Sequence, residues 1–256
     1  MRMLVGTAVL TVGLATLPVT AAQAGSTWLV GIKAGDTTAV AGHRVVFTGK
    51  VHPTAAASGL QVVLQEQAKP GKPWVTQRKA KVSPAGAYRV TDTPTISFLH
   101  SYRVIMPASG THTRGVSPTV KVRVYAWDHL TDHASVNNRY MNIGEVNVNG
   151  TAYADSVWAR YAEQTSVEYN LNHQCVKLRS TFGVSDASST GGQAEVDVQS
   201  DGAPVYTNTF DLGETETRTV ALDKPLKIRL AAQNTATAPD AYGYGAFADP
   251  QVLCTH

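Results

Sequence analysis

The sequence predicts an all-β protein, and three observations support this class. Short runs in which every second residue is apolar recur along the chain, as in strands with one buried and one hydrated face. Clusters of Gly, Pro, Ser and Asn separate these runs at short, even intervals. In the first half, no stretch longer than ten residues follows the helical period of about 3.6 residues. With 256 residues, the chain is long enough for two domains with cores of their own.

Residues 1–24 have the three parts of a secretory signal peptide. Arg2 gives a positive start, an apolar run extends from Leu4 to about Leu17, and Ala22-Gln23-Ala24 supplies the small residues that signal peptidase requires. A membrane anchor is the weaker interpretation, because this run is shorter than the roughly 20 residues that a spanning helix needs. No later segment is apolar enough for a membrane span. We therefore expect a secreted protein that works in the extracellular space or at the cell wall.

Residues 25–126 predict an immunoglobulin-like β-sandwich. Turn formers such as Ser83-Pro84-Ala85-Gly86 separate about seven strands at regular spacing, which is the pattern of an antiparallel sandwich. The expected strands cover residues 28–33, 44–51, 60–67, 74–82, 87–92, 102–106 and 119–125. This part of the chain contains no cysteine pair, which excludes a disulfide-centred antibody-type domain. Residues 27–126 also resemble, loosely, bacterial immunoglobulin-like or fibronectin-like modules.

Residues 127–139 break the alternation and are interpreted as a linker. Residues 140–256 resume it, and they predict a second β domain in which each strand has one buried face. In residues 194–210, valines alternate with acidic residues before the turn sequence Asp201-Gly202. This pattern predicts a β-hairpin.

The two cysteines are expected to form a disulfide bond. Outside the cytosol a pair of thiols tends to oxidise, and Cys175 and Cys254 are the only two in the chain. Their bridge would close a loop of about 80 residues, which the chain-entropy model values at about 4.5 kcal/mol. The bond would hold the last strand against an earlier strand of the same domain. Metal ligation or a free catalytic thiol is the remaining alternative.

Charge divides the chain into a basic half and an acidic half. Residues 25–126 contain 13 Lys and Arg against 3 Asp and Glu, whereas residues 127–256 contain 8 against 16. A cluster of positive side chains could hold anionic wall polymers, or it could face the acidic domain and fix the angle between the two. Nucleic acid is not expected as a partner, because the protein is expected to be exported. The cluster consists of Lys69, Lys72, Arg78, Lys79 and Lys81.

The second half resembles the NPCBM family, the carbohydrate-binding modules attached to secreted bacterial glycoside hydrolases. Five motifs of residues 142–256 follow the family's order: "NVNGTAY", "SVEYNLNHQCVKLRSTFGVSD", "VDVQSDGAPVY", "LDKPLKIRL" and "AFADPQVLC". The resemblance implies a galactose-binding-like jelly roll that recognises sugars with the loops at one end. Two positions depart from the family: Tyr161-Ala162 stands where members often have His-Ala, and Phe247 stands where many have Trp.

Sugar recognition needs a flat apolar surface for the C–H face of the ring and polar groups for the hydroxyls. Two expected loops offer both. "SVWARYAEQ" offers Trp158, Arg160 and Tyr161, and "TAPDAYGYGAF" offers Asp240, Tyr242 and Tyr244. The alternative is that these aromatic residues only cap the end of the core.

Metal binding and catalysis have less support in the sequence. Asp186 and Asp240 could bind a structural calcium ion, although isolated turn aspartates more often accept hydrogen bonds from their own backbone. His129 and His133 in "HLTDH" are four residues apart, but no third ligand is evident. G-x-S-x-G is absent, and most acidic residues alternate along strands as on a hydrated face, so the paired carboxylates of a glycosidase are not expected.

We therefore predict a secreted, non-catalytic carbohydrate-binding protein. Its jelly roll would bind a glycan or cell-wall polysaccharide, and its basic domain would serve as a spacer or wall tether. A structural or protein-interaction module that binds no sugar is the alternative, and a glycoside hydrolase or its accessory subunit is the weakest one. The sequence leaves the oligomeric state and the identity of the sugar open.

Overall fold

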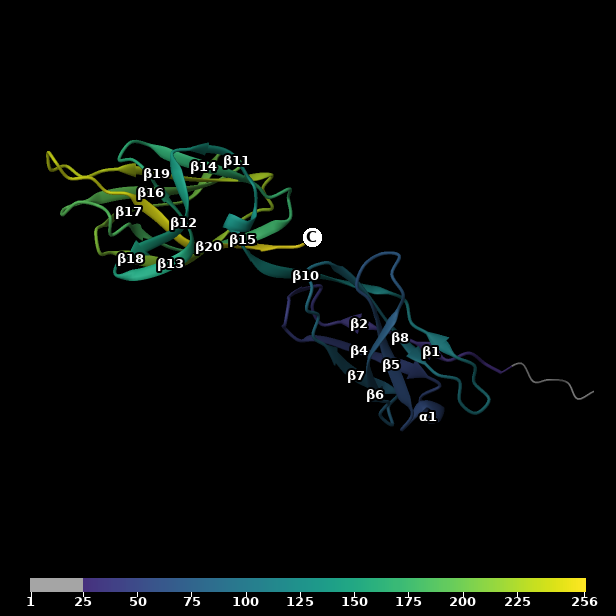
Figure 1. Cartoon of the computed structure of the whole chain (residues 1–256). Coiled ribbons are helices and arrows are strands. Elements are labelled where there is room, and N and C mark those ends of the chain that lie inside the picture. Colours follow the sequence, from purple (N-terminus) through teal and green to yellow (C-terminus); the bar gives the residue numbers. More distant parts are fainter. Residues whose placement is uncertain (1–24) are drawn as a thin grey trace, which may run out of the picture.

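The computed structural model of the chain describes residues 25–256. The predicted signal peptide, residues 1–24, lies outside the described residues. The described chain forms two lobes that are joined by strand β10 (Figure 1). None of the helices in the described residues is long and apolar enough to cross a membrane.

The first lobe is built from two β-sheets that enclose one core. One sheet contains β1, β2, β4 and β7, and the other contains β3, β5, β6, β8, β9 and the first half of β10. Phe47, Leu64 and Tyr102 are fully buried between them. The all-β sandwich is therefore confirmed, whereas its immunoglobulin-like character stays a prediction. The elements are β1 (Leu29–Val30), β2 (Lys33–Ala34), β3 (Thr38–Val40), β4 (Val45–His52), α1 (Thr54–Ala57), β5 (Gln61–Gln67), β6 (Val75–Lys81), β7 (Ala87–Asp92), β8 (Leu99–Met106), β9 (Gly115–Val116) and β10 (Val120–His129).

A network of ionisable groups is buried inside this lobe. The Nδ1 atom of His100 is hydrogen-bonded to the Glu66 carboxylate, and the Tyr102 hydroxyl donates to Glu66 Oε1 at 3.1 Å and to Asp92 Oδ2 at 2.9 Å. All four side chains belong to residues that are less than a tenth exposed. Burial raises the pKa of Asp92 above its ordinary value. Burial lowers the pKa of His100, but the hydrogen bonds to Glu66 and to the Ile96 carbonyl outweigh it, so the net direction is upward.

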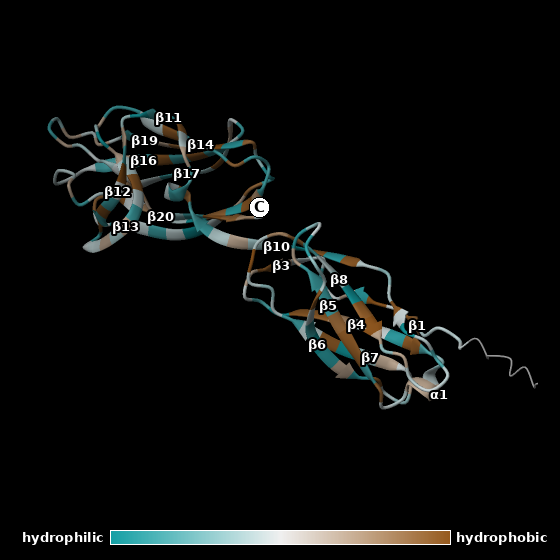
Figure 2. Cartoon of the chain, turned by 45° about the vertical axis from the view of Figure 1, so that its right-hand side comes forward, coloured by the Kyte–Doolittle hydropathy of each residue, from teal (hydrophilic) through white to brown (hydrophobic). Residues whose placement is uncertain are grey.

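The second lobe is a sandwich of two five-stranded antiparallel sheets, as the predicted jelly roll requires. One sheet has the order β12-β13-β20-β15-β18, and the other has the order β11-β14-β19-β16-β17. Hydrophobic residues are concentrated along the strands of both lobes (Figure 2). The elements are η1 (Leu130–Asp132), β11 (Ser135–Arg139), β12 (Met141–Val148), β13 (Thr151–Ala159), β14 (Thr165–Asn170), β15 (Cys175–Val184), β16 (Gln193–Ser200), β17 (Ala203–Asp211), β18 (Thr215–Ala221), β19 (Lys227–Asn234) and β20 (Gly245–Cys254).

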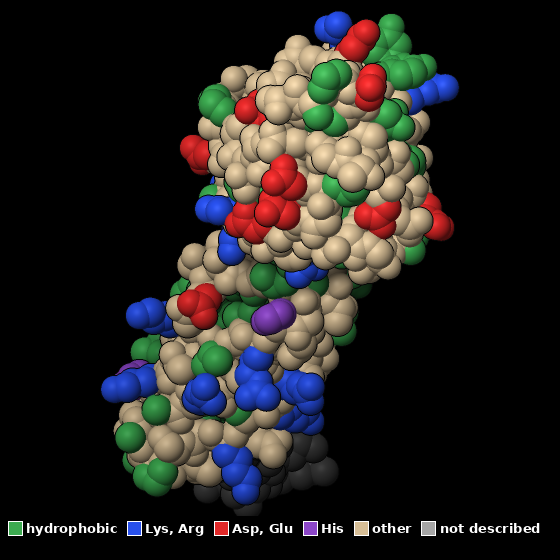
Figure 3. Space-filling view, turned by 90° about the vertical axis from the view of Figure 1, so that its left-hand side faces the viewer, with side chains coloured by type: hydrophobic (Ala, Val, Ile, Leu, Met, Phe, Trp, Pro, Cys, Tyr) green, Lys and Arg blue, Asp and Glu red, His purple; other side chains and the backbone are tan. Residues whose placement is uncertain are grey.

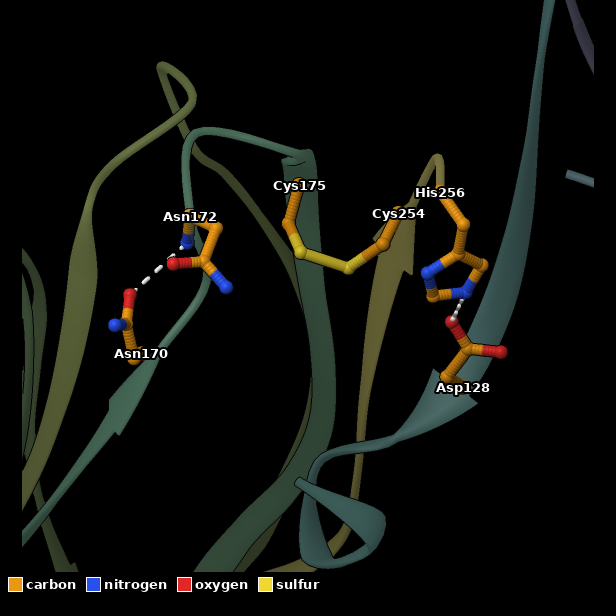
Figure 4. The surroundings of a disulfide bond; sticks show 6 residues. All are labelled: Asp128, Asn170, Asn172, Cys175, Cys254 and His256. Carbon is orange, nitrogen blue, oxygen red and sulfur yellow. Dashed lines mark hydrogen bonds and ion pairs between the residues drawn. A yellow bond between two sulfur atoms is a disulfide. The ribbon is translucent and has the colours of Figure 1, made fainter. Parts of the chain in front are cut away.

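The disulfide bond joins Cys175 at the start of β15 to Cys254 at the end of β20 (Figure 4). The two cysteines are register partners in this antiparallel pair. The bond therefore holds the last strand against an earlier strand of the same lobe, as the sequence predicts. The predicted hairpin is also present, with Asp201 and Gly202 in positive-φ conformations between β16 and β17.

The segment 127–139, predicted as a linker, differs in the structure. Strand β10 continues through it to His129 and pairs with β20, from Ala126 opposite Cys254 to His129 opposite Gln251. Strand β11 then pairs with β14. The sequence pattern missed β11 because all five of its residues are exposed, so no apolar alternation marks this edge strand.

Candidate functional site

The aromatic residue best placed for ligand contact is Trp158, which lies on β13. The sequence predicts a loop here, but Ser156–Ala159 belong to the strand, and Trp158 is the register partner of Ala246 on β20. Val157 points into the main core. Trp158 therefore lies on the outer face of the sheet, where it packs half-buried against a small cluster of Val146, Val148, Ala246 and Ala248.

A bulge in β12 shapes one wall beside Trp158. The register between β12 and β13 shifts between Gly144 and Val146, and Gly144 has a φ of 137°, which favours glycine. After the bulge, Val146 and Val148 are buried, while Glu145 and Asn147 are exposed. Glu145 and Asn147 line one pocket together with Trp158.

The loop after β15 forms the opposite wall. Asp186 N donates to the Asn147 carbonyl, and Gly150 N donates to Asp186 Oδ2, both at 2.9 Å. These bonds fix the loop to the β12–β13 turn, so the Asp186 carboxylate accepts from a different loop and not from its own backbone. The resulting pocket has a volume of about 410 Å³ and is lined by Glu145, Val146, Asn147, Trp158, Ser185, Asp186 and Ala187. We call it the Trp158 pocket.

Two predicted tyrosines lie on a loop that is tied to the same wall. Tyr242 N donates to Ser189 Oγ at 2.7 Å, and Tyr244 N donates to Ser188 Oγ at 2.9 Å. The two rings have centroids 5.1 Å apart. Tyr242 is 39% exposed, whereas Tyr244 packs against the main core. The tyrosine loop therefore flanks the pocket through residues 185–189, but it does not line it.

Arg160 and Tyr161 form a separate exposed aromatic patch after β13. The guanidinium of Arg160 lies 5.6 Å from the Tyr161 ring centroid. Tyr140, which the sequence interpretation missed, contacts Tyr161 edge to face at 5.4 Å. Tyr140 lies between β11 and β12, and no sequence pattern marked it as a ligand-binding residue. Neither Arg160 nor Tyr161 lines the Trp158 pocket.

The structure thus brings only some of the predicted ligand-binding residues together in one pocket. Trp158 lines the pocket with Asp186, which was considered for calcium, and with Glu145 and Asn147, which were missed. Asp240 is exposed in the loop before Tyr242. Neither Asp186 nor Asp240 belongs to a group of three potential metal ligands among residues 25–256. Phe247, the second departure from the family pattern, is fully buried against Phe182 and lies away from solvent.

A second groove with a mostly polar lining crosses the other sheet. Most of its lining residues belong to β16 and β19, and its two carboxylates already accept hydrogen bonds within the protein. Gln233 Nε2 donates to Glu195 at 3.0 Å, and Thr207 Oγ1 donates to Asp197 at 2.8 Å. No aromatic side chain lines it. This arrangement is that of a hydrated strand face, and the Trp158 pocket is the better candidate.

A comparison with known protein families matches most of the second lobe to one family. The family model of the NPCBM/NEW2 domain matches residues 117–252, which is more than half of the chain. The chain belongs to the NPCBM/NEW2 domain family. This confirms the resemblance that five motifs indicated. The NPCBM/NEW2 match begins before the predicted start at residue 142 and includes the segment 127–139. This agrees with the structure, in which β10 pairs with β20 and β11 pairs with β14 of the second lobe.

Solved structures similar to this chain include carbohydrate-binding modules. CBM51 of a Clostridium perfringens GH95 protein, in complex with methyl-galactose, is 13% identical, with a TM-score of 0.40, over 49% of this chain and 99% of that one. The CBM51-2 and INT domains of Clostridium perfringens ZmpB are 11% identical, with a TM-score of 0.40, over 62% of this chain and 38% of that one. CBM36 with calcium and xylotriose is 17% identical, with a TM-score of 0.29, over 50% and 98%. No curated protein matches the chain. The family assignment rests on the NPCBM/NEW2 model alone.

Proposed function

We propose that this protein is a non-catalytic carbohydrate-binding protein that binds a glycan in the Trp158 pocket. The observation that carries the proposal is the half-buried indole of Trp158 beside Glu145, Asn147 and Asp186. An indole face suits the C–H side of a pyranose, and carboxylate and amide groups suit its hydroxyls. Membership of the NPCBM/NEW2 family supports the same conclusion, since the resemblance implied sugar recognition.

A glycan array on the purified protein tests this proposal, with Trp158→Ala as the decisive variant. Truncation of a central aromatic contact typically costs about 2 kcal/mol or more, which is about thirtyfold in Kd. We expect binding to one class of sugar that Trp158→Ala loses. Trp74→Ala is the matched control, because Trp74 lies in the first lobe beneath Arg103 and is remote from the pocket in sequence and lobe.

Two further measurements distinguish the alternative binding sites and functions. Tyr242→Ala tests whether the tyrosine loop, rather than the Trp158 pocket, contacts the sugar. Arrays with calcium and with a chelator test whether binding depends on calcium. The absence of binding to every sugar, both with calcium and with the chelator, would favour the structural or protein-interaction role. Release of reducing sugar from a bound glycan would instead identify a hydrolase.

We further propose that the protein is exported. The signal-like residues 1–24 and a disulfide between its only two cysteines support this location, because such bonds persist in oxidising compartments. Detection of the processed chain in the extracellular fraction, with an N-terminus at Gly25, is the expected result. A chain found only inside the cell, with both thiols reduced, would contradict it.

The first lobe is proposed to act as a spacer or wall tether. Lys and Arg gather on this lobe, whereas Asp and Glu predominate on the second (Figure 3). Arg78, Lys79 and Lys81 are exposed on β6, which is the end strand of its sheet. A row of exposed cations on an edge strand suits an extended anionic polymer.

A further inference from the structure

A cavity lies where the two lobes meet, and it shares no lining residue with the Trp158 pocket. Its volume is about 490 Å³. Small-molecule sites typically have about 300–1,000 Å³ and often lie between domains. One wall belongs to the first lobe, where β3 lies beside β10 (Figure 2). The other wall belongs to β15 and β20 of the second lobe. We call this cavity the junction cleft, and its lining includes Asp36, His43, Arg44 and Tyr125 of the first lobe and Lys177 and Leu253 of the second.

Backbone hydrogen bonds fix the first wall of the junction cleft. Strand β3 pairs with β10, with Val40 opposite Tyr125. Ala41 N donates to the Tyr125 carbonyl at 2.7 Å, and His43 N donates to the Val40 carbonyl at 2.9 Å. The turn that carries His43 and Arg44 is therefore tied directly to the strand that joins the lobes.

The disulfide bond fixes the second wall. Lys177 follows Cys175 by two residues, and Leu253 directly precedes Cys254, so the bond joins the two strands that supply this wall. The residue after Tyr125 is the register partner of Cys254. Both walls therefore belong to one continuous sheet, and the junction cleft is present without a ligand.

The charged side chains of the junction cleft have no ionic partners. Arg44 and Lys177 are exposed, and neither forms an ion pair with a carboxylate in the described part of the chain. Asp36 is the only acidic residue among the described residues of the lining, and His43 adds positive charge when it is protonated. The lining thus has an excess of positive charge that comes from both lobes, which suits an anionic group bound between them.

Tyr125 adds a polar group that also lacks a partner. The residue is only 7% exposed, and its hydroxyl forms no hydrogen bond with any other group of residues 25–256. Buried tyrosine hydroxyls usually have such a partner. Leu253, which is buried beside it in the lining, is apolar. The junction cleft therefore offers an apolar surface, a free hydroxyl and charged groups to one ligand.

We propose that the junction cleft binds an acidic sugar, that is, a saccharide with a carboxylate group. Arg44 and Lys177 bind the carboxylate, and Asp36 and the Tyr125 hydroxyl bind the ring hydroxyls. The C–H groups of the ring contact Leu253 and its apolar neighbours. A neutral sugar leaves both cations unpaired, so the site discriminates by charge. This site is independent of the proposed glycan site at Trp158.

The test is an NMR titration of the ¹⁵N-labelled, disulfide-intact protein with D-galacturonate and D-glucuronate. D-galactose and D-glucose are the matched neutral probes, because they differ from the acids only at the carboxylate carbon. We expect the acids to shift the amide signals of residues 36–45, 176–177 and 253, and the neutral sugars to leave these signals unchanged.

Single substitutions then test the roles of the side chains. Arg44→Gln and Lys177→Gln should each raise the Kd of the uronates by about tenfold or more, and Tyr125→Phe should raise it by about fivefold. Arg89→Gln and Lys224→Gln are the matched controls, because these exposed cations lie outside the junction cleft. Both controls should leave the Kd unchanged. The amide spectrum of each variant shows whether the fold is kept.

Four results would overturn the proposal. The first is the absence of amide shifts at the junction cleft with either acid. The second is an equal response to acetate, which would indicate an adventitious carboxylate only. The third is an equal loss of affinity in the cleft variants and their controls, which would indicate net charge. The fourth is loss of uronate binding in Trp158→Ala. We expect this variant to retain uronate binding, so the two sites can fail independently.

Discussion

Among single residues, His100 is expected to make the stability of the first lobe depend on pH. Its pKa is raised above the ordinary value of 6.5 by the hydrogen bonds to Glu66 and Ile96, which outweigh burial. The folded protein therefore holds this proton more tightly than the unfolded chain, so the stabilisation is present below about pH 6.5 and is lost as pH rises through the folded-state pKa. Asp92, whose pKa burial also raises, acts in the same direction from its ordinary value of 3.8 upward.

We expect the unfolding temperature of the first lobe to fall as pH rises from about 6 to about 9. Replacement of His100 by Gln should flatten this slope, and it should lower stability by about 2 to 3 kcal/mol because the buried Glu66 carboxyl group loses its hydrogen bond to the imidazole. Calorimetry of both proteins across this range is the measurement. Parallel pH profiles for the two proteins would show that His100 is not the group responsible.

Glu145 is the residue whose charge the glycan proposal uses most directly. It lines the pocket and is exposed, so Glu145→Gln should leave the fold unchanged. Hydrogen bonds to charged groups contribute about 1.5–3 kcal/mol, so we expect the glycan Kd to rise by about tenfold or more. Glu163→Gln, a matched change at an exposed position outside the pocket, should have no effect on the Kd. An equal loss in both variants would point to net charge instead of a specific contact.

Among the elements, β20 depends on the disulfide more than any other strand. It pairs with β10, β13 and β15, and Cys254 anchors its end to Cys175. The double variant Cys175→Ser/Cys254→Ser should destabilise the second lobe by about 4.5 kcal/mol and leave the first lobe unaffected. Chemical denaturation monitored separately for each lobe measures this. An unchanged midpoint for the second lobe would contradict the structural role of the bond.

The sequence predicted elements where apolar alternation and turn residues agree. The β16–β17 hairpin has both, since buried Val196 and Val198 precede Asp201-Gly202. The end of strand β13 was predicted as a loop. Ser156, Val157 and Ala159 are all buried there, so the alternation of apolar and polar residues is lost. Glu145 and Asn147 were missed because the bulge at Gly144 decides which wall they form, and strand register cannot be read from a single strand.

At the scale of the whole molecule, the two lobes share one continuous sheet and differ in charge. Strand β10 pairs with β8 in one lobe and with β20 in the other, so one eleven-stranded sheet extends through both. The junction is therefore a paired strand and not a flexible linker. A basic lobe and an acidic lobe are held at a defined orientation by this shared strand. On the proposed function, this orientation would allow the tether and the glycan site to act on the same surface.

The tether proposal predicts salt-dependent retention on isolated cell wall. Retention should fall as ionic strength rises from about 0.05 to about 0.5 M, because exposed charges are screened over about a Debye length. Replacing Arg78, Lys79 and Lys81 by Glu should abolish it. The same net change at Lys33, Lys50 and Arg114, exposed on other parts of the lobe, should reduce it less. Retention that ignores salt, or equal losses in both triple variants, would exclude a tether on β6.

A crystal structure of the protein with the glycan that binds most strongly in the array tests the central claim most directly. We predict a sugar ring stacked on the Trp158 indole, with its hydroxyls bonded to Glu145, Asn147 or Asp186. A sugar bound on the Tyr242 loop, on the polar groove of β16 and β19, or on the first lobe would contradict it.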